Sequence, residues 1–152
     1  VSMLRECAAG GGNLLLNIGP KPDGSLYPPC DVELEKVGAW LDKYGPSVYE
    51  ATDPMPQDWM ITGAFTRKGD TVYYHCNCWP GSELAIGGLR CKVTSAKLMG
   101  DREVEYEQKA DRLVLRGLPE DAPDELATVI ELKVEGEPRH ELGAGHVLMS
   151  EV

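Results

Sequence analysis

The densest group of reactive side chains in this sequence is one histidine with two cysteines, His75, Cys76 and Cys78. Side chains alternate between the faces of a strand, so the two thiols would share one face and the imidazole the other. Structural zinc usually takes four ligands from two short knuckles such as Cys-x-x-Cys, and only one pair stands here. We therefore predict two small core residues and no metal site, while a disulfide from either cysteine to Cys91 stays open.

The five cysteines are an odd number, so at least one is free or pairs between chains. Their spacing does not resemble a disulfide framework, and we expect them to be mostly reduced.

Aromatic side chains gather near the same place, namely Tyr73, Tyr74 and Trp79, with Pro80 after them. Aromatic faces can stack on sugar rings, which makes a carbohydrate-binding surface one interpretation. However, Tyr73 and Tyr74 point to opposite faces of a strand, so at most one joins Trp79 on a shared platform. Packing in a core or against a neighbouring domain is the preferred interpretation.

Carboxylates are numerous but scattered along the chain. Glu103, Glu105 and Glu107 alternate on one face of a strand, as on a solvated sheet edge. No carboxylate pair stands out at a catalytic separation, and His140 and His146 suggest no Ser-His-Asp arrangement. The sequence therefore predicts no catalytic residue.

Length and charge limit the partners. A chain of 152 residues fits one domain, or one domain and a piece of another. A net charge of -10 disfavours binding to nucleic acid and to anionic membrane surfaces. No run approaches the roughly 20 apolar residues of a membrane span. We expect neither nucleic acid nor membrane as a partner.

After Met60 the hydrophobic period becomes two, and turn signals separate short strand-like runs. Strands spaced roughly 8–12 residues apart predict an antiparallel β-sandwich. The candidate strands are Ile61–Thr66, Thr71–Cys78, Glu83–Ile86, Lys92–Leu98, Val104–Gln108, Arg112–Arg116, Thr128–Val134 and His146–Met149.

The first third of the chain has a different pattern. A helix over Ser2–Ala9 would end at Gly10, which can take the left-handed C-terminal position. Asn13–Ile18 is a short apolar run between breakers, which predicts a strand buried on both faces. A Pro-rich loop leads to an amphipathic helix over Asp31–Tyr44, whose apolar stripe would cover that strand. The order helix, buried strand, loop, helix is typical of an α/β repeat.

Asn17 stands at the C-terminal end of the predicted strand, the side on which active sites form in α/β barrels. It is the one candidate substrate-binding residue. The alternative is that its amide only caps loop backbone.

The predicted fold class is mostly β, an antiparallel β-sandwich preceded by a helix–strand–helix remnant of an α/β barrel. Residues 1–52 would hold the barrel part, 53–59 a linker and 60–152 the sandwich. A complete barrel needs roughly 250 residues and does not fit in this chain.

The run Gly-Gly-Asn-Leu-Leu-Leu-Asn-Ile-Gly-Pro at residues 11–20, followed by Asp23-Gly24, resembles the end of the catalytic barrel in α-L-fucosidases of glycoside hydrolase family 29. In that family the segment forms the eighth barrel strand and the loop after it. Residues 34–41, with Tyr49 beyond, resemble the last barrel helix. Residues 65–73 and Trp79-Pro80 resemble the start of the C-terminal β-domain, and the resemblance weakens after about residue 136.

The resemblance implies a retaining enzyme that removes terminal α-L-fucose with an aspartate nucleophile and a carboxylic acid/base. It implies no metal or organic cofactor. The family's catalytic and fucose-binding residues lie in earlier segments that have no counterpart here, so none is carried over except the region around Asn17. The family commonly has Asn-Gly-Glu after the last helix, where this chain has Gly45-Pro46-Ser47.

The resemblance makes the parent protein an enzyme and this fragment an inactive portion with a structural accessory sandwich. Fucosylated glycans are then partners of the parent, whose location would be extracellular, periplasmic or lysosomal. An autonomous carbohydrate-binding module is the alternative function. The orphaned apolar strand also predicts a homodimer, because unpaired strands invite edge pairing with a second chain.

Overall fold

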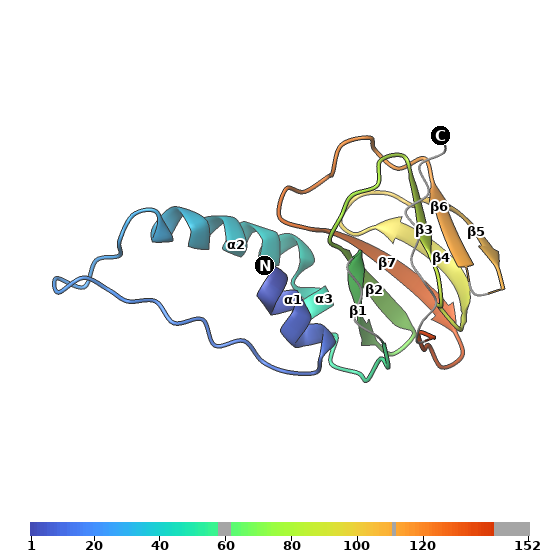
Figure 1. Ribbon diagram of the computed structural model, residues 1–152, viewed down its shortest axis with the longest axis horizontal. Coiled ribbons are helices and arrows are strands. Elements are labelled where there is room, and N and C mark those ends of the chain that lie inside the picture. Colours follow the sequence, from blue (N-terminus) through green and yellow to red (C-terminus); the bar gives the residue numbers. More distant parts are fainter. Residues whose placement is uncertain (58–61, 111, 142–152) are drawn as a thin grey trace.

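The computed structural model describes residues 1–57, 62–110 and 112–141. Figure 1 shows the helices together on one side of a β-sandwich. The elements in chain order are α1 Ser2–Ala9, α2 Cys30–Tyr44, α3 Pro46–Tyr49, β1 Gly63–Lys68, β2 Thr71–Cys76, β3 Glu83–Ile86, β4 Lys92–Leu98, β5 Glu105–Lys109, β6 Arg112–Arg116 and β7 Thr128–Glu135.

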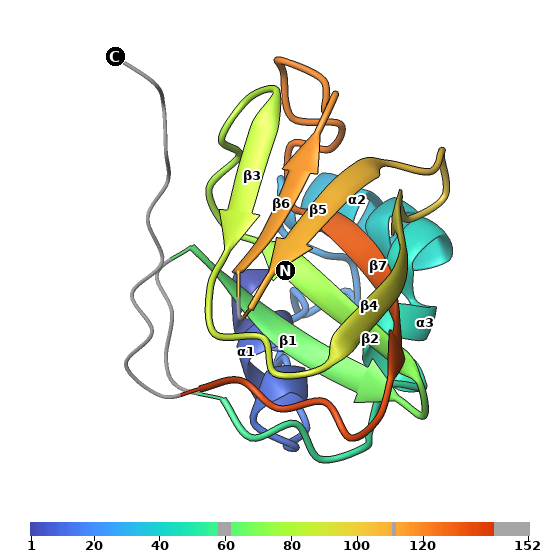
Figure 2. The same cartoon turned by 90° about the vertical axis from the view of Figure 1, so that its right-hand side faces the viewer.

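The strands form two antiparallel sheets, one ordered β1-β2-β7-β4 and the other β3-β6-β5 (Figure 2). The predicted antiparallel β-sandwich is therefore confirmed. β3, β4 and β6 have the predicted bounds. β2 and β7 differ from the prediction at one end, by two residues and one residue, whereas both ends of β1 lie two residues later and both ends of β5 one residue later than predicted. The predicted strand His146–Met149 lies outside the described residues.

The core between the sheets follows from the alternation along each strand. Tyr74 of β2 and Ile130 of β7 pair across the ladder and point inward, toward Leu84 of β3 and Leu115 of β6. The opposite face of the four-stranded sheet is buried as well along β2, whose six residues are all buried. This sheet consequently needs cover on both faces.

The helices supply the second cover. Trp40 and Tyr44 of α2 and Val48 of α3 pack on Tyr73 of β2 and Val129 of β7. The Trp40 indole Nε1–H donates a hydrogen bond to the backbone oxygen of Ala127 at 2.8 Å. A buried indole with its N–H satisfied contributes a large apolar area without a desolvation cost. The C-terminal end of α2 is thereby fixed on the sandwich.

The prediction of a buried strand at Asn13–Ile18 is wrong for this chain. Residues 12–20 have no regular secondary structure and pair with no strand. The side chain of Leu15 is 93% exposed and that of Leu16 is 53% exposed. A strand needs neighbours to pair with its N–H and C=O groups, and this segment runs away from the described strands (Figure 1).

We call residues 11–29, which join α1 to α2, the arm. Figure 1 shows that it runs far from the sandwich before α2 leads the chain back. The helix–strand–helix expected at the start is thus a helix, an arm and a helix. At the end of α1 the left-handed position belongs to Gly11, with φ of 72°, and not to Gly10 as the sequence suggested.

The segment expected to contain the linker is partly structured. α3 follows α2 directly because Gly45 keeps a right-handed helical backbone, and Pro46 suits the first turn of the new helix. Thr52 forms a parallel bridge with Arg67, and both amide atoms of the Gln57 side chain bond the backbone of Phe65. These contacts cover the free edge of β1. The division at residues 53–59 stays a prediction.

Within the described residues, none of the helices combines the length and apolar character needed to cross a membrane.

A buried polar chain joins α3 to the outer face of the sheet. The Thr66 hydroxyl donates to the backbone oxygen of Ser47 at 2.6 Å, and its oxygen lies 2.9 Å from His75 Nε2. Because the hydroxyl has a single hydrogen, which it gives to Ser47, His75 must donate from Nε2 to Thr66. Burial lowers the pKa of His75 to about 3, and the charge on Arg5 adds to the effect.

We predict that acid weakens the fold through His75. Its folded pKa lies below the roughly 6.5 of an unfolded histidine, so protonation favours the unfolded chain. The contribution of neutral His75 to the free energy of unfolding is complete above about pH 6.5. It falls as the pH is lowered toward 3, by at most about 1.4 kcal/mol per pH unit. Urea unfolding of the chain between pH 7 and 5 should show this loss, before the carboxylates titrate.

The matched variant is His75→Gln, because the glutamine amide can place a neutral donor near the position of Nε2. Its free energy of unfolding should be lower at pH 7 but should change less between pH 7 and 5. An unchanged slope in this variant would contradict the assignment to His75.

Candidate functional site

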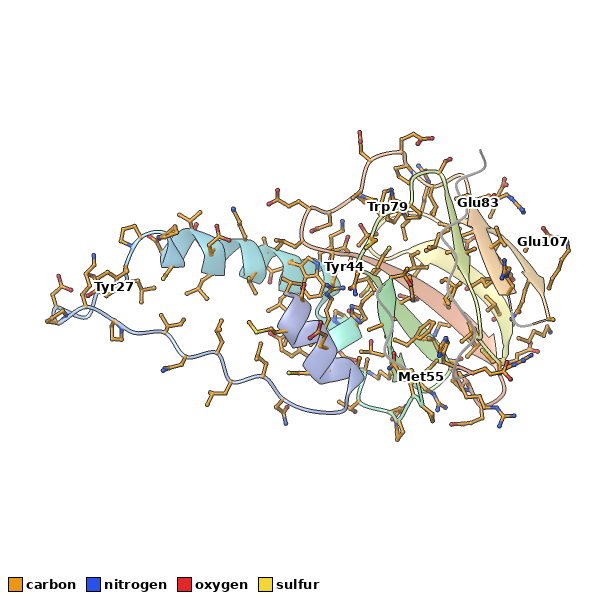
Figure 3. The ribbon with its side chains drawn as sticks, in the orientation of Figure 1. Tyr27, Tyr44, Met55, Trp79, Glu83 and Glu107 are labelled. Carbon is orange, nitrogen blue, oxygen red and sulfur yellow. The ribbon has the colours of Figure 1, made fainter. Side chains whose placement is uncertain are left out.

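Asn17 lies on the arm and is exposed to solvent. Among the described residues its amide has no hydrogen-bond partner, so the alternative role as a cap of loop backbone is not observed. The arm orders itself elsewhere: Asp23 accepts hydrogen bonds from Ser25, and the Lys21 ammonium lies 5.4 Å from the Tyr27 ring centre. Figure 3 shows Tyr27 at the far end of the arm. Asn17 is thus available but stands apart from the sandwich.

The aromatic cluster forms no open platform. Tyr73 belongs to the core under the helices and Tyr74 to the core between the sheets, as their alternation predicts. They are 7% and 1% exposed. Trp79 packs partly against the inner core, and its Nε1–H donates to the backbone oxygen of Pro119 at 2.8 Å. The preferred interpretation, packing, holds for both tyrosines.

The cysteines form no disulfide, so the bridge to Cys91 is not made. Cys76 is buried, and its thiol donates to the backbone oxygen of Cys78 at 3.0 Å. Burial raises the pKa of Cys76 to about 12 and that of Cys91 to about 11, which keeps both as thiols at neutral pH. Across the described ranges no three His, Cys, Asp or Glu side chains gather to hold a metal ion.

Several acidic residues of the sandwich form ion pairs with basic residues on its surface. Arg116 pairs with Glu83 at 2.9 Å and with Glu107 at 3.1 Å, all on the three-stranded sheet. Hydrogen bonds from Lys109 and then Arg116 lower the pKa of Glu107. A general acid of a glycosidase needs the opposite shift. These carboxylates therefore suit an exposed sheet surface, and β5 is indeed an edge strand.

One candidate site was not predicted from the sequence. A cavity of about 420 Å³ lies between α1 and β1, and Arg5 and Asn77 contribute polar groups to its lining. Arg5 is only 4% exposed, and its Nη1 donates to Asn77 Oδ1 at 2.6 Å. The signal was present in the helical spacing, since Arg5 shares its face of α1 with Val1, Leu4 and Ala8. A charged residue on the apolar face of a helix indicates a specific role, because burying an unpaired charge is costly.

Comparison with known proteins connects the chain to one family. The family model described as alpha-L-fucosidase matches residues 1–46. The alpha-L-fucosidase of Branchiostoma floridae is 38% identical over 103 residues, which are 65% of this chain and 23% of the relative. The human tissue alpha-L-fucosidase is 31% identical over 131 residues, which are 81% of this chain and 28% of the relative.

Solved structures agree with these relatives. Alpha-L-fucosidase isoenzyme 1 from Paenibacillus thiaminolyticus superimposes with a TM-score of 0.73 at 31% identity, over 89% of this chain and 34% of its own. A GH29 alpha-L-fucosidase from Bacteroides thetaiotaomicron gives a TM-score of 0.72 at 28% identity, over 86% and 30%. The chain thus spans between a fifth and about a third of the length of the proteins it matches. Together with the shared fold, these matches show that the chain belongs to the α-L-fucosidases of glycoside hydrolase family 29, as a fragment of such a protein.

Proposed function

We propose that this chain is the C-terminal portion of a retaining α-L-fucosidase, and that it completes and braces the catalytic barrel without supplying a catalytic carboxylate. The observation that carries the proposal is the arm. Its residues 11–20 resemble the last barrel strand of the family, and they lie unpaired with two leucines largely exposed. α1 holds the first end of the arm near the sandwich, and α2 runs back from the second end until Trp40 and Tyr44 pack on the sheet. The sandwich then acts as a support from which the arm reaches the rest of the barrel.

The substrate of the parent enzyme would be terminal α-L-fucose on glycans. Retaining hydrolysis needs a nucleophile and an acid/base about 5–5.5 Å apart. The ion pairs of Glu83 and Glu107 with Arg116 favour the ionised carboxylate, which makes both residues unsuited to the acid/base role. Asn17 would border the sugar, because its exposed amide is able to bind a hydroxyl group.

We predict that the isolated chain does not hydrolyse fucosides, since the two carboxyl groups of a double displacement are missing. The measurement is release of aryl alcohol from an aryl α-L-fucoside, with a full-length family 29 enzyme as the positive control. Hydrolysis above blank that tracks the purified chain through chromatography would contradict the proposal and would require an acid pair within this fragment.

The competing function is an autonomous carbohydrate-binding module. We predict weak or absent binding of sugar, because both tyrosines of the aromatic cluster serve the cores. Titration calorimetry with fucose and fucosylated oligosaccharides should give no dissociation constant below the millimolar range, which corresponds to a binding free energy of about -4 kcal/mol. A micromolar signal that Trp79→Ala abolishes would favour the module instead.

The arm also supports the proposal of a dimer of the isolated chain. Each large apolar side chain left in water forfeits about 1.5–3 kcal/mol, and the arm exposes Leu15 and Leu16. Two arms that pair around a two-fold axis would cover these side chains and also satisfy backbone groups.

Sedimentation velocity should therefore show a species larger than 16.6 kDa. Leu15→Asp should shift it to monomer, because a carboxylate cannot be buried between two arms. Met3→Asp is the control, since Met3 is exposed on α1 and off the arm. A monomer at high concentration in the unaltered chain would refute the dimer.

A further inference from the structure

Arg5 is a buried cation without a counter-ion in the part of the chain that the structure describes. Its side chain lies under α1 against the outer face of the sheet, 4% exposed. None of the ion pairs among the described residues includes it. Burial lowers the pKa of the Arg5 guanidinium although the nearby charges of Cys76 and Glu6 oppose this shift, and the pKa of neighbouring His75 is lowered too, first by burial and then by the Arg5 charge. A buried charge that lacks a partner is costly, so its surroundings indicate that something else compensates it.

The hydrogen bonds of Arg5 are also incomplete. A guanidinium has five N–H groups. Nη1 donates to Asn77 Oδ1 at 2.6 Å and Nη2 donates to Ser2 Oγ at 3.1 Å. Nε is inaccessible to water and has no acceptor. Three N–H groups therefore lack an acceptor among the described residues. An unsatisfied buried donor costs more free energy when it is charged than when it is neutral.

The cavity of about 420 Å³ that Arg5 lines has mostly carbon walls, from Ala9, Met55, Pro56 and Ala64. Figure 3 shows Met55 below the strands at this side of the sandwich. Glu6 is the acidic group of the lining and is exposed at the surface.

We propose that this cavity binds a small organic monocarboxylate, whose carboxylate contacts the Arg5 guanidinium and whose carbon body fills the apolar part. A planar carboxylate matches the planar fork of an arginine and accepts two N–H bonds at once. The neighbouring carboxylate of Glu6 opposes a second negative charge on the ligand. The apolar walls favour an acid with a few carbons over a bare inorganic anion. Nothing in the proposed fucosidase role requires this site.

The test is an NMR titration of the full 152-residue chain at about pH 7 with sodium propionate, which is ionised there. The resonance of the Arg5 Nε–H group should shift in a saturable way. Propionamide has the same shape without the charge, so its affinity should be at least about ten-fold weaker, as expected for loss of a charge-assisted hydrogen bond. Sodium sulfate should also bind at least about ten-fold more weakly.

Arg5→Met keeps an unbranched side chain of similar reach and removes the charge. It should retain the thermal stability of the chain or exceed it, and the backbone resonances of Ala64 and Asn77 should no longer respond to propionate. Arg116→Met is the matched control, because it removes one positive charge from the opposite sheet and should bind propionate normally. The proposal is overturned by a shift that does not saturate, by equal binding of propionamide or sulfate, or by undiminished binding in Arg5→Met.

Discussion

The burial of β2 on both of its faces is the constraint on which the other elements depend. One face of β2 packs into the sandwich and the other needs a second layer, because Tyr73 and Val129 would otherwise face water. The helices before the sandwich provide that layer, and the Trp40 indole bond to Ala127 ties them to it. Their cover explains the apolar Tyr73 and Val129 on this outer face, whereas farther along it Glu131 and Lys133 form ion pairs at the surface.

Most of the sandwich was predictable from the sequence because its strands carry their own signals. Apolar residues at every second position, with turn residues between the runs, indicate where a strand lies and which of its side chains point to each face of the sheet. β3, β4 and β6 were placed to the residue for this reason. Tyr73 and Tyr74 were assigned to opposite faces by the same alternation, and they do occupy separate cores.

The first third was less predictable because an apolar run says that a segment favours burial, but not what buries it. Asn13–Ile18 satisfies every local rule for a covered strand, yet the described residues provide no strand beside it. Arg5 shows the reverse case. Arginine is usually solvated, and although the helical spacing puts Arg5 on the apolar face of α1, its place beside Asn77 follows only from the packing of α1 on the sheet. α3 was missed because a single turn of four residues leaves too short a pattern.

The arm has a further consequence as a tether. α1 is only eight residues long, too short to persist as an isolated helix in water, so its fold depends on contact with the sheet. The arm keeps α1 near that surface at an effective concentration that a flexible linker raises to the millimolar range. A single proteolytic cut in the exposed arm would turn this contact into a bimolecular one. At ordinary protein concentrations α1 would then dissociate and unfold, and the outer face of the sheet would lose part of its cover.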